Sequence, residues 1–397
     1  MKKIALIFST KLTNPNGASA VMRSLYNNKG SFQRNGIELN LYSPDNILKE
    51  NNLVVKSDPK TKKKFSKKII AYIKNNVPKN NLYAIASILI SGLRPASRII
   101  RQYDLVNNNE DILFFHEIFT CYKYIKHRKN KKNKIILVLH NNGDTFAMVR
   151  KSFPEIEKSF FYKYLLRIEK KVLHEVDKLG YVAEYPLKNF IKLNPNFNVN
   201  KLFFVHNGLS QEEKIKRNSN SFKIEICCVG TICERKGQRF IVEALAKLKK
   251  EQTIPDIHFS IIGGGEIEKE LIGLSEKFGL SEHISFEGSS DKINSFLYKS
   301  NIFILPSTDE GLPIAIIEAM RASLPIVSTK VGGIPEMIKE GETGIFIEPS
   351  TTGVYDFLIN IDKYNWMEMG KKSNNLFLNK FTDDKMINSY SRILKSL

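Results

Sequence analysis

The sequence predicts an α/β protein with two domains, each built on a parallel β-sheet that helices cover on both faces. Its 397 residues are too many for one core of ordinary size. Short runs rich in Ile, Leu, Val and Phe alternate with helical patterns along both halves of the chain. Because continuous apolar strands separated by helices are typical of a parallel sheet covered on both faces, each half predicts such a sheet.

The apolar runs define the expected strands. In the first half they are KIALIFS, IELNLYS, DILFFH and KIILVLH, and the longest helical pattern there is EIEKSFFYKYLLRIEKKVLHEVDK. In the second half they are KIEICCVG, IHFSIIG, HISFEG, NIFILPS, LPIVST and TGIFIEP, with helical patterns in GQRFIVEALAKLKK and EIEKELIGLSEKFG. Both halves therefore read as doubly wound, Rossmann-like sheets.

The segment between the halves turns polar after Asn207 and Gly208, which marks the expected linker. We predict a first domain at 1–207, a second at 208–380, and a C-terminal helix at 381–397 that packs back towards the first domain. Two such sheets facing one another leave a central cleft at their strand ends, where ligands of these folds bind.

Composition excludes several classes of protein. The four cysteines form no disulfide framework, which favours a reducing, cytoplasmic setting. No C-x-x-C pair or histidine cluster suggests a metal site, so we expect neither a metal nor a cofactor. The first apolar run, Ile4 to Phe8, is too short for a signal peptide. The longest, YAIASILISGL, is about half the roughly 20 residues of a membrane span, so we expect no transmembrane segment.

The net charge of +20 is divided unevenly. Residues 1–208 hold 37 Lys and Arg against 15 Asp and Glu, a charge of +22, and the remainder holds 24 against 26, a charge of −2. Such an asymmetry predicts two domains with different tasks.

The stretch DEGLPIAIIEAM, Asp309 to Met320, carries two glutamates in an otherwise apolar run. On a single helix Glu310 and Glu318 would lie roughly 80° apart, off any shared stripe. Since Pro313 suits a helix start, we expect Glu310 in the loop after the strand NIFILPS and Glu318 in the helix.

This placement puts groups that can bind a ligand at the expected cleft. The amides of Gly311 and Leu312 would point out of the helix N-terminus, a natural phosphate site. In the loop VGTICERKGQ, Lys236 lies beside another helix start, as a diphosphate clamp would. Glu310 could bind a sugar, and Glu318 could bind a ribose diol. Together with the phosphate-binding groups, they match the parts of a nucleotide sugar. The ordinary structural alternative is an N-cap acid and a surface glutamate on an amphipathic helix.

At this point the chain resembles the retaining glycosyltransferases of family 4, which have the GT-B fold, two Rossmann-like domains facing a central cleft. The resemblance covers nearly the whole chain and is densest over residues 222–349. It implies that Glu310 and Glu318 form the family's E-x7-E motif, with Glu310 on the donor sugar and Glu318 on the ribose. It also implies that Lys236 and the amides after Glu310 hold the diphosphate.

The resemblance assigns residues in the first half as well. The family has a glycine loop against the donor phosphate after the first strand, and NPNGASAVM supplies Gly17, with Asn16 where a second glycine is common. The family also has a histidine that ends a strand beneath the cleft, which implies a catalytic role for His140 in LVLHNNGD. His116 in LFFHEIF is placed similarly and is the weaker candidate.

One position departs from the family pattern. Where an arginine is common early in the lysine loop, this chain has Thr231, so Arg235 or another base would have to compensate at the diphosphate. No Asp-x-Asp occurs in the sequence, which gives a metal-clamped alternative fold no support. The resemblance implies a metal-independent hexosyltransferase-type enzyme, with a UDP-sugar favoured over a GDP-sugar.

The basic first half has its own candidate function. In KSDPKTKKKFSKKIIAYIKNN, apolar residues at helical spacing are bordered by Lys62, Lys63, Lys64, Lys67 and Lys68, which suits a helix lying on an anionic bilayer. A solvated lysine-rich face is the alternative. We expect peripheral association with the inner face of the cell membrane, where a glycan or lipid-linked acceptor for capsule or lipopolysaccharide synthesis would be found.

Two rival functions stay open at this point. One is a nucleotide-sugar epimerase on the same fold, which would need no acceptor. The other is a non-enzymatic protein that binds nucleic acid or an anionic surface. A charge of +22 on one domain is typical of such a protein. Against nucleic acid, no recognised motif occurs, and aromatic residues do not interleave with the basic runs.

Overall fold

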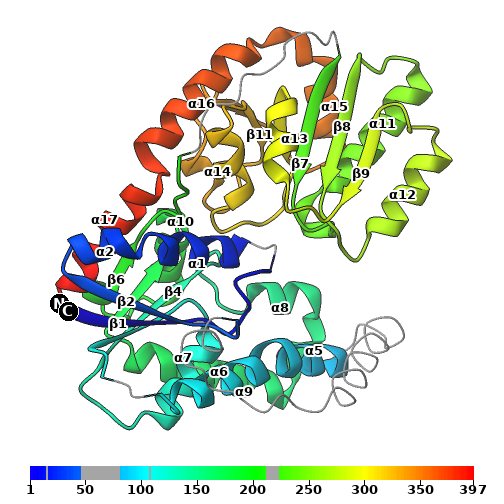
Figure 1. Ribbon diagram of the computed structural model, residues 1–397. Helices are drawn as coiled ribbons and strands as arrows, with labels where there is room; N and C mark the ends of the chain where they lie inside the picture. Colours follow the sequence, from blue (N-terminus) through cyan, green and yellow to red (C-terminus); the bar gives the residue numbers. More distant parts are fainter. Residues whose placement is uncertain (15–16, 46–80, 107–108, 212–222) are drawn as a thin grey trace.

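The computed structural model describes residues 1–14, 17–45, 81–106, 109–211 and 223–397. These residues form two α/β domains, one above the other, each with its own parallel sheet (Figure 1). The two-domain GT-B fold expected from the sequence is thereby confirmed. No helix in the described part of the chain is long and apolar enough to cross a membrane.

The first sheet has six strands in the order β2-β1-β3-β4-β5-β6, all paired in parallel. Its centre is wholly apolar, since Ile4 to Ile7 of β1 are buried without exposed surface. The strands are β1 (Lys2–Ile7), β2 (Ile37–Tyr42), β3 (Ile112–Phe115), β4 (Lys134–Leu139), β5 (Lys178–Tyr181) and β6 (Leu202–Phe204).

Helices cover both faces of this sheet (Figure 1). They are α1 (Gly17–Asn27), α2 (Lys29–Arg34), α5 (Asn81–Ile88), the π-helical turn η1 (Leu89–Leu93), α6 (Arg94–Tyr103), α7 (Ile118–His127), α8 (Ala147–Ser152), the 3-10 turn η2 (Pro154–Lys158), α9 (Phe160–Glu175), α10 (Glu184–Leu193) and the 3-10 turn η3 (Val199–Lys201). The helix predicted within residues 155–178 begins only at Phe160, because Ser159 caps it by accepting from the amide of Tyr162 and the preceding residues form η2.

The second sheet has the order β12-β11-β10-β7-β8-β9, again all parallel. Every strand predicted for this half is present. They are β7 (Ile224–Val229), β8 (Ile257–Ile262), β9 (Ile284–Gly288), β10 (Ile302–Leu305), β11 (Ile326–Ser328) and β12 (Gly344–Phe346).

The helical segments of the second half pack around this sheet. They are the 3-10 turn η4 (Glu234–Lys236), α11 (Gln238–Glu251), α12 (Glu268–Lys277), α13 (Ile293–Lys299), α14 (Ile314–Arg321), the 3-10 turn η5 (Ile334–Glu336), α15 (Thr351–Ile359), the 3-10 turn η6 (Ile361–Lys363), α16 (Trp366–Lys380) and α17 (Asp383–Lys395).

The chain returns to the first domain at its C-terminus. Helix α16 belongs to the second domain, whereas α17 lies beside α1 and α2, so the two chain ends meet (Figure 1). Asn28 donates to Asp383 over 2.9 Å, and the Lys2 ammonium donates to the carbonyl of Lys395 over 2.8 Å. The C-terminal helix therefore ties the second half of the chain to the first sheet.

Candidate active site at the domain interface

Sheet topology brings together two loops that are far apart in sequence. In the second sheet the strand order reverses between β7 and β10, which are hydrogen-bonded neighbours. The loops that leave the carboxyl ends of such strands flank the crevice where ligands of open α/β sheets bind. The loop after β7 carries Lys236 and the loop after β10 carries Glu310, so the two meet although 74 residues separate them.

Glu310 is the centre of a buried charged cluster. Its Oε1 lies 2.6 Å from Nζ of Lys236 and 3.3 Å from Nη1 of Arg235, and it accepts from the hydroxyl of Ser307 over 2.8 Å. The side chain of Glu310 is only 6% exposed. Burial opposes ionisation, but Lys236, Arg235 and Ser307 outweigh it, so the pKa of Glu310 lies below its usual value. The glutamate is therefore an anion held between two cations.

Two glycines let the loops approach this closely. Gly237 has a φ of +74°, and a Cβ there would lie 2.1 Å from the carbonyl oxygen of Pro306 at the end of β10. Gly332 has a φ of +54°, and a Cβ there would lie 1.6 Å from the carbonyl oxygen of Glu310. Left-handed backbone and missing side chains are thus required on both sides of the glutamate loop.

The two glutamates of the motif occupy different kinds of backbone, as their spacing predicts. Helix α14 begins at Ile314 with Pro313 as its N-cap, so Glu310 is a loop residue and Glu318 is half-buried on the fifth residue of the helix. Within the described residues, the amides of Gly311 and Leu312 donate no hydrogen bond. Two backbone donors at the helix start are therefore available to an anion.

Sequence reasoning missed one residue of this cluster. Ser307 was overlooked although it is a polar residue directly after β10, which is a usable signal. Arg235 had been expected only as a substitute for the missing arginine at Thr231. It reaches the cluster, donating to the carbonyl of Asp309 as well as lying beside Glu310.

The first domain presents a matching loop edge. Its strand order reverses between β1 and β3, and Glu117 after β3 accepts from the amide of Ser9 over 2.9 Å and from the hydroxyl of Thr10 over 3.2 Å. Glu117 was not predicted from sequence, yet it fixes the loop that leads to Gly17. Beside it, Nδ1 of His116 lies 2.8 Å from Nε2 of His140, and burial lowers the pKa of His140 to about 4.

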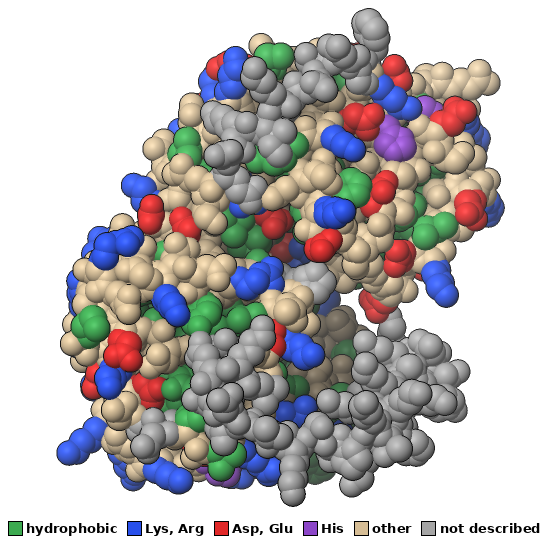
Figure 2. Space-filling view, viewed as in Figure 1, with side chains coloured by type: hydrophobic (Ala, Val, Ile, Leu, Met, Phe, Trp, Pro, Cys, Tyr) green, Lys and Arg blue, Asp and Glu red, His purple; other side chains and the backbone are tan. Residues whose placement is uncertain are grey.

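The structure brings the first-domain candidates against the second domain. A Cβ on Gly17 would lie 3.4 Å from Cγ1 of Ile314, so the start of α1 faces the start of α14. A Cβ on Gly311 would lie 2.6 Å from the carbonyl oxygen of His140. The surface is hollowed where the two domains meet (Figure 2). Gly17 and His140 therefore contact the segment Gly311–Ile314 that directly follows Glu310.

Polar contacts also cross the interface. Asn142 donates to Asp309 over 3.1 Å, and Lys151 of α8 donates to the hydroxyl of Thr308 over 3.2 Å. Elsewhere on the interface, Glu336 of the second domain accepts from the amides that begin α10, those of Glu184 and Tyr185. These contacts fix the orientation of the domains around the candidate site.

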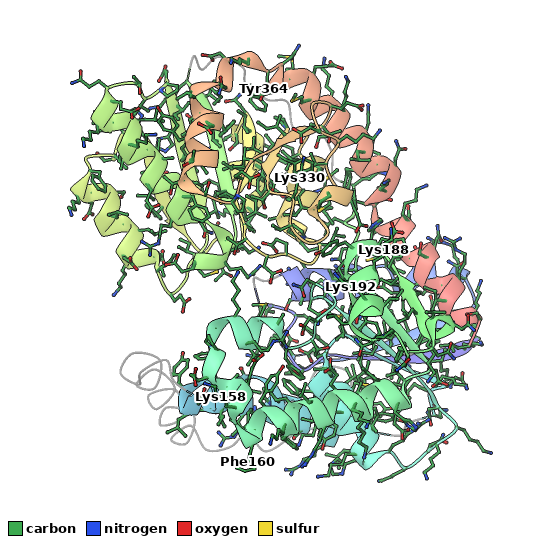
Figure 3. All side chains as sticks on the ribbon, turned by 180° about the vertical axis from the view of Figure 1, so that it is seen from behind. Lys158, Phe160, Lys188, Lys192, Lys330 and Tyr364 are labelled. Carbon is green, nitrogen blue, oxygen red and sulfur yellow. The ribbon has the colours of Figure 1, made fainter. Side chains whose placement is uncertain are left out.

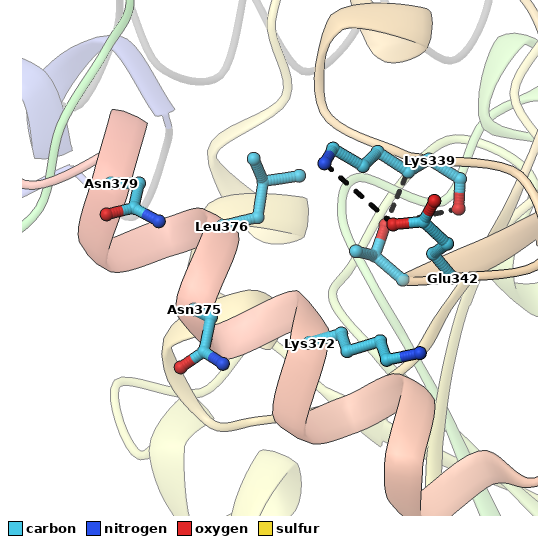
Figure 4. A pocket seen from close by; sticks show the side chains of 7 residues that line it. Lys339, Glu342, Lys372, Asn375, Leu376 and Asn379 are labelled. Carbon is cyan, nitrogen blue, oxygen red and sulfur yellow. Dashed lines mark hydrogen bonds and ion pairs between the residues drawn. The ribbon is translucent and has the colours of Figure 1, made fainter.

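Two further features lie apart from it. The predicted membrane residues Lys62, Lys63, Lys64, Lys67 and Lys68 fall outside the described residues. A separate cavity of about 280 Å³ lies beside α16 in the second domain, and no candidate site residue lines it (Figure 4). Its lining consists of Lys339, Glu342, Thr343, Lys372, Asn375, Leu376 and Asn379.

Comparisons with known proteins bear on the family and the fold. Residues 210–358 match the family model described as glycosyl transferases group 1. An uncharacterized glycosyltransferase of Methanocaldococcus jannaschii is 27% identical over 282 residues, which are 69% of this chain and 70% of that protein. The putative colanic acid biosynthesis glycosyltransferase WcaL of Salmonella typhimurium is 34% identical over 129 residues, but only 30% of this chain and 31% of WcaL are aligned.

A solved structure shares the whole fold. HepE of Anabaena, in complex with UDP and glucose, superposes with a TM-score of 0.67 at 14% identity, and the match covers 100% of both chains. The likeness confirms the GT-B architecture. With the family match in the second half, it supports a glycosyltransferase.

The glycine beside the glutamate loop provides a first test. Gly332→Ala should destabilise the protein by about 3 kcal/mol or more, because its Cβ would overlap the Glu310 carbonyl and the backbone is left-handed. Gly341→Ala is the matched control, since Gly341 has a φ of +73° but no atom within 4 Å of the added Cβ. It should cost about 1 kcal/mol. Denaturant unfolding measures both, and equal losses would contradict the close approach.

Proposed function

We propose that the protein is a retaining, metal-independent glycosyltransferase that moves a sugar from a nucleotide-diphosphate sugar to a hydroxyl of a glycan or lipid-linked acceptor. The observation that carries the proposal is the cluster of Lys236, Arg235 and Glu310 at the β7/β10 crossing point. Gly17 and His140 of the first domain contact the segment that directly follows Glu310. An anion surrounded by two cations and two available amides is matched to a ligand that combines hydroxyls with phosphates.

The cluster suits the charge that develops during transfer. Breaking the bond from sugar to diphosphate leaves negative charge on the phosphate and positive charge on the sugar ring. Lys236, Arg235 and the amides of Gly311 and Leu312 stabilise the first, an electrostatic contribution that usually dominates. Glu310 accepts hydrogen bonds from the donor sugar, and Glu318 reaches the ribose from within α14.

Retention of configuration requires the acceptor to attack from the face that the diphosphate leaves. In this arrangement the departing phosphate takes the proton of the acceptor hydroxyl, so no protein base is needed. His140, whose carbonyl packs against Gly311, holds the transferred sugar and transfers no proton. The low pKa of His140 fits that role, because a neutral imidazole adds no positive charge beside the positive sugar ring.

Similar proteins narrow the donor and the pathway class. HepE was solved with UDP and glucose and separately with UDP-glucose, which favours a UDP-sugar over a GDP-sugar here. WcaL is named for colanic acid, and another relative, of Salmonella typhi, for the Vi polysaccharide. These names support a role in cell-surface polysaccharide synthesis, and we propose that the reaction takes place in the cytoplasm.

The basic first domain supports docking to an anionic membrane surface. Beyond the lysine-rich segment at 60–74, the described helix α9 exposes Phe160 by 89% beside Lys163, whose ammonium lies 5.5 Å from the ring centroid. Phe160 lies at the end of the first domain remote from the second (Figure 3). Exposed aromatic and basic side chains together suit a membrane interface.

Removal of the charged contacts tests the site. Lys236→Ala and Glu310→Gln should each lower kcat of sugar transfer by about 10² or more, the usual scale for losing a charged transition-state contact. Lys371→Ala, at an exposed ion pair 3.8 Å from Glu368, is the control and should leave kcat unchanged. Near-normal turnover by a folded Lys236→Ala protein would place the diphosphate elsewhere.

A panel of UDP- and GDP-sugars should be assayed first, and release of a free isomer without acceptor would indicate an epimerase.

Stereochemistry and metal dependence form a separate test. We expect product NMR to show the anomeric configuration of the donor retained, and activity to survive EDTA. Inversion, or complete loss of activity that added Mg²⁺ or Mn²⁺ restores, would rule out the proposed mechanism.

Membrane binding can be measured with vesicles. Replacing Lys62, Lys63, Lys64, Lys67 and Lys68 by Gln should weaken binding to phosphatidylglycerol vesicles at least about tenfold, because each lysine near the surface contributes about 1 kcal/mol. Binding of the parent should also fall steeply as salt rises. Five exposed lysines of the second domain replaced by Gln, namely Lys249, Lys250, Lys269, Lys277 and Lys371, serve as the control. Equal sedimentation of the two variants would make the basic segment a solvated face.

A further inference from the structure

Two neighbouring histidines differ in how they face the candidate site. His116 is 5% exposed and packs against the rings of Phe114 and Tyr390, with centroids 4.7 and 6.4 Å away. His140 is less buried, and its carbonyl lies against Gly311 beside the glutamate loop. Nδ1 of His116 is 2.8 Å from Nε2 of His140. His116 is therefore the inner member of the pair and His140 the outer one.

The hydrogen bond between the rings restricts their protons. Burial lowers the pKa of both rings, so both are neutral near pH 7, and one nitrogen of the pair donates while the other accepts. Nε2 of His116 is buried and has no partner in the described part of the chain. A buried N–H without an acceptor is more costly than a bare lone pair. His116 accordingly carries its proton on Nδ1 and donates it to His140.

We propose that His116 is a positioning residue, which holds His140 in the tautomer that carries its proton on Nδ1. When one nitrogen of a neutral imidazole accepts a hydrogen bond, the ring proton is held on the other nitrogen. Of the two rings, only His116 has a nitrogen both buried and unpartnered among the described residues, so Nδ1 of His140 is not enclosed in the same way. Resting on the proposed function, this N–H donates to an oxygen of the transferred sugar.

The tautomer can be read directly without any assay of transfer. The chain has seven histidines, so ¹⁵N-histidine labelling gives few ring signals, and those of His140 are identified by their loss in His140→Gln. In the parent protein we expect His140 to show a protonated Nδ1 and a bare Nε2, with the reverse proton position absent. A His140 ring protonated on Nε2 in the parent would overturn the proposal.

Variants then connect the tautomer to turnover. His116→Leu should release His140 into a mixture of tautomers and lower kcat about tenfold, the effect of one lost hydrogen bond. His116→Asn keeps an N–H near the Nδ1 position. It should therefore restore part of the His140 tautomer preference and part of kcat. Tyr390→Phe is the control from the same pocket, because its buried hydroxyl has no partner among the described residues, and it should change neither readout.

The two hypotheses fail differently. If His116→Leu folds and leaves the His140 tautomer and kcat as in the parent, His116 is not a positioning residue. If the parent transfers sugar from no nucleotide sugar, the proposed function fails, and the NMR spectrum alone then decides whether His116 sets the tautomer.

Discussion

The interaction on which the candidate site depends is the buried ion pair between Lys236 and Glu310. An ionised carboxylate that is 6% exposed is costly unless it is paired and hydrogen-bonded, and Lys236, Arg235 and Ser307 meet that requirement. Loss of one partner would leave an uncompensated charge, at a cost of about 3–5 kcal/mol. The ion pair thus stabilises the contact between the two loops, and the loops in turn keep the two charges together. It exists only because β7 and β10 are neighbours in the sheet.

The same topological rule organises the first domain. Its strand order reverses between β1 and β3, and there Glu117 ties down the loop after β1 while His116 supports His140 from behind. Both sheets thus direct the loops at the carboxyl ends of their strands to one interface. Helix α17 closes the arrangement, since Tyr390 packs on Phe114 with ring centroids 5.3 Å apart, directly behind the histidine pair.

The features that the sequence predicted are those that depend on residues close together in the chain. The strands of the second sheet were predictable because short apolar runs alternate with helical patterns there, and β10 and β11 are buried throughout. Strands β5 and β6 were not predicted. Strand β5 has four residues and directly follows the long helical pattern, and β6 has three residues and precedes the polar segment read as the linker. Within the site, the spacing and flanking residues separated loop Glu310 from helical Glu318. The contacts of Asn142 and Glu117 depend on segments distant in sequence, which no local pattern encodes.

The distribution of charge also separates two tasks. The half that carries the proposed donor site has a net charge of −2, so overall attraction cannot be what recruits an anionic diphosphate there. We propose that recognition comes from the few cations and amides placed at the β7/β10 crossing point, of which Lys236 and Arg235 both face Glu310. The +22 of residues 1–208 is therefore not required for the donor. We propose that it serves a second anionic partner on the acceptor side, and a bilayer surface, which is broad and presents charge at low density, fits a dispersed basic excess better than a single compact ligand does.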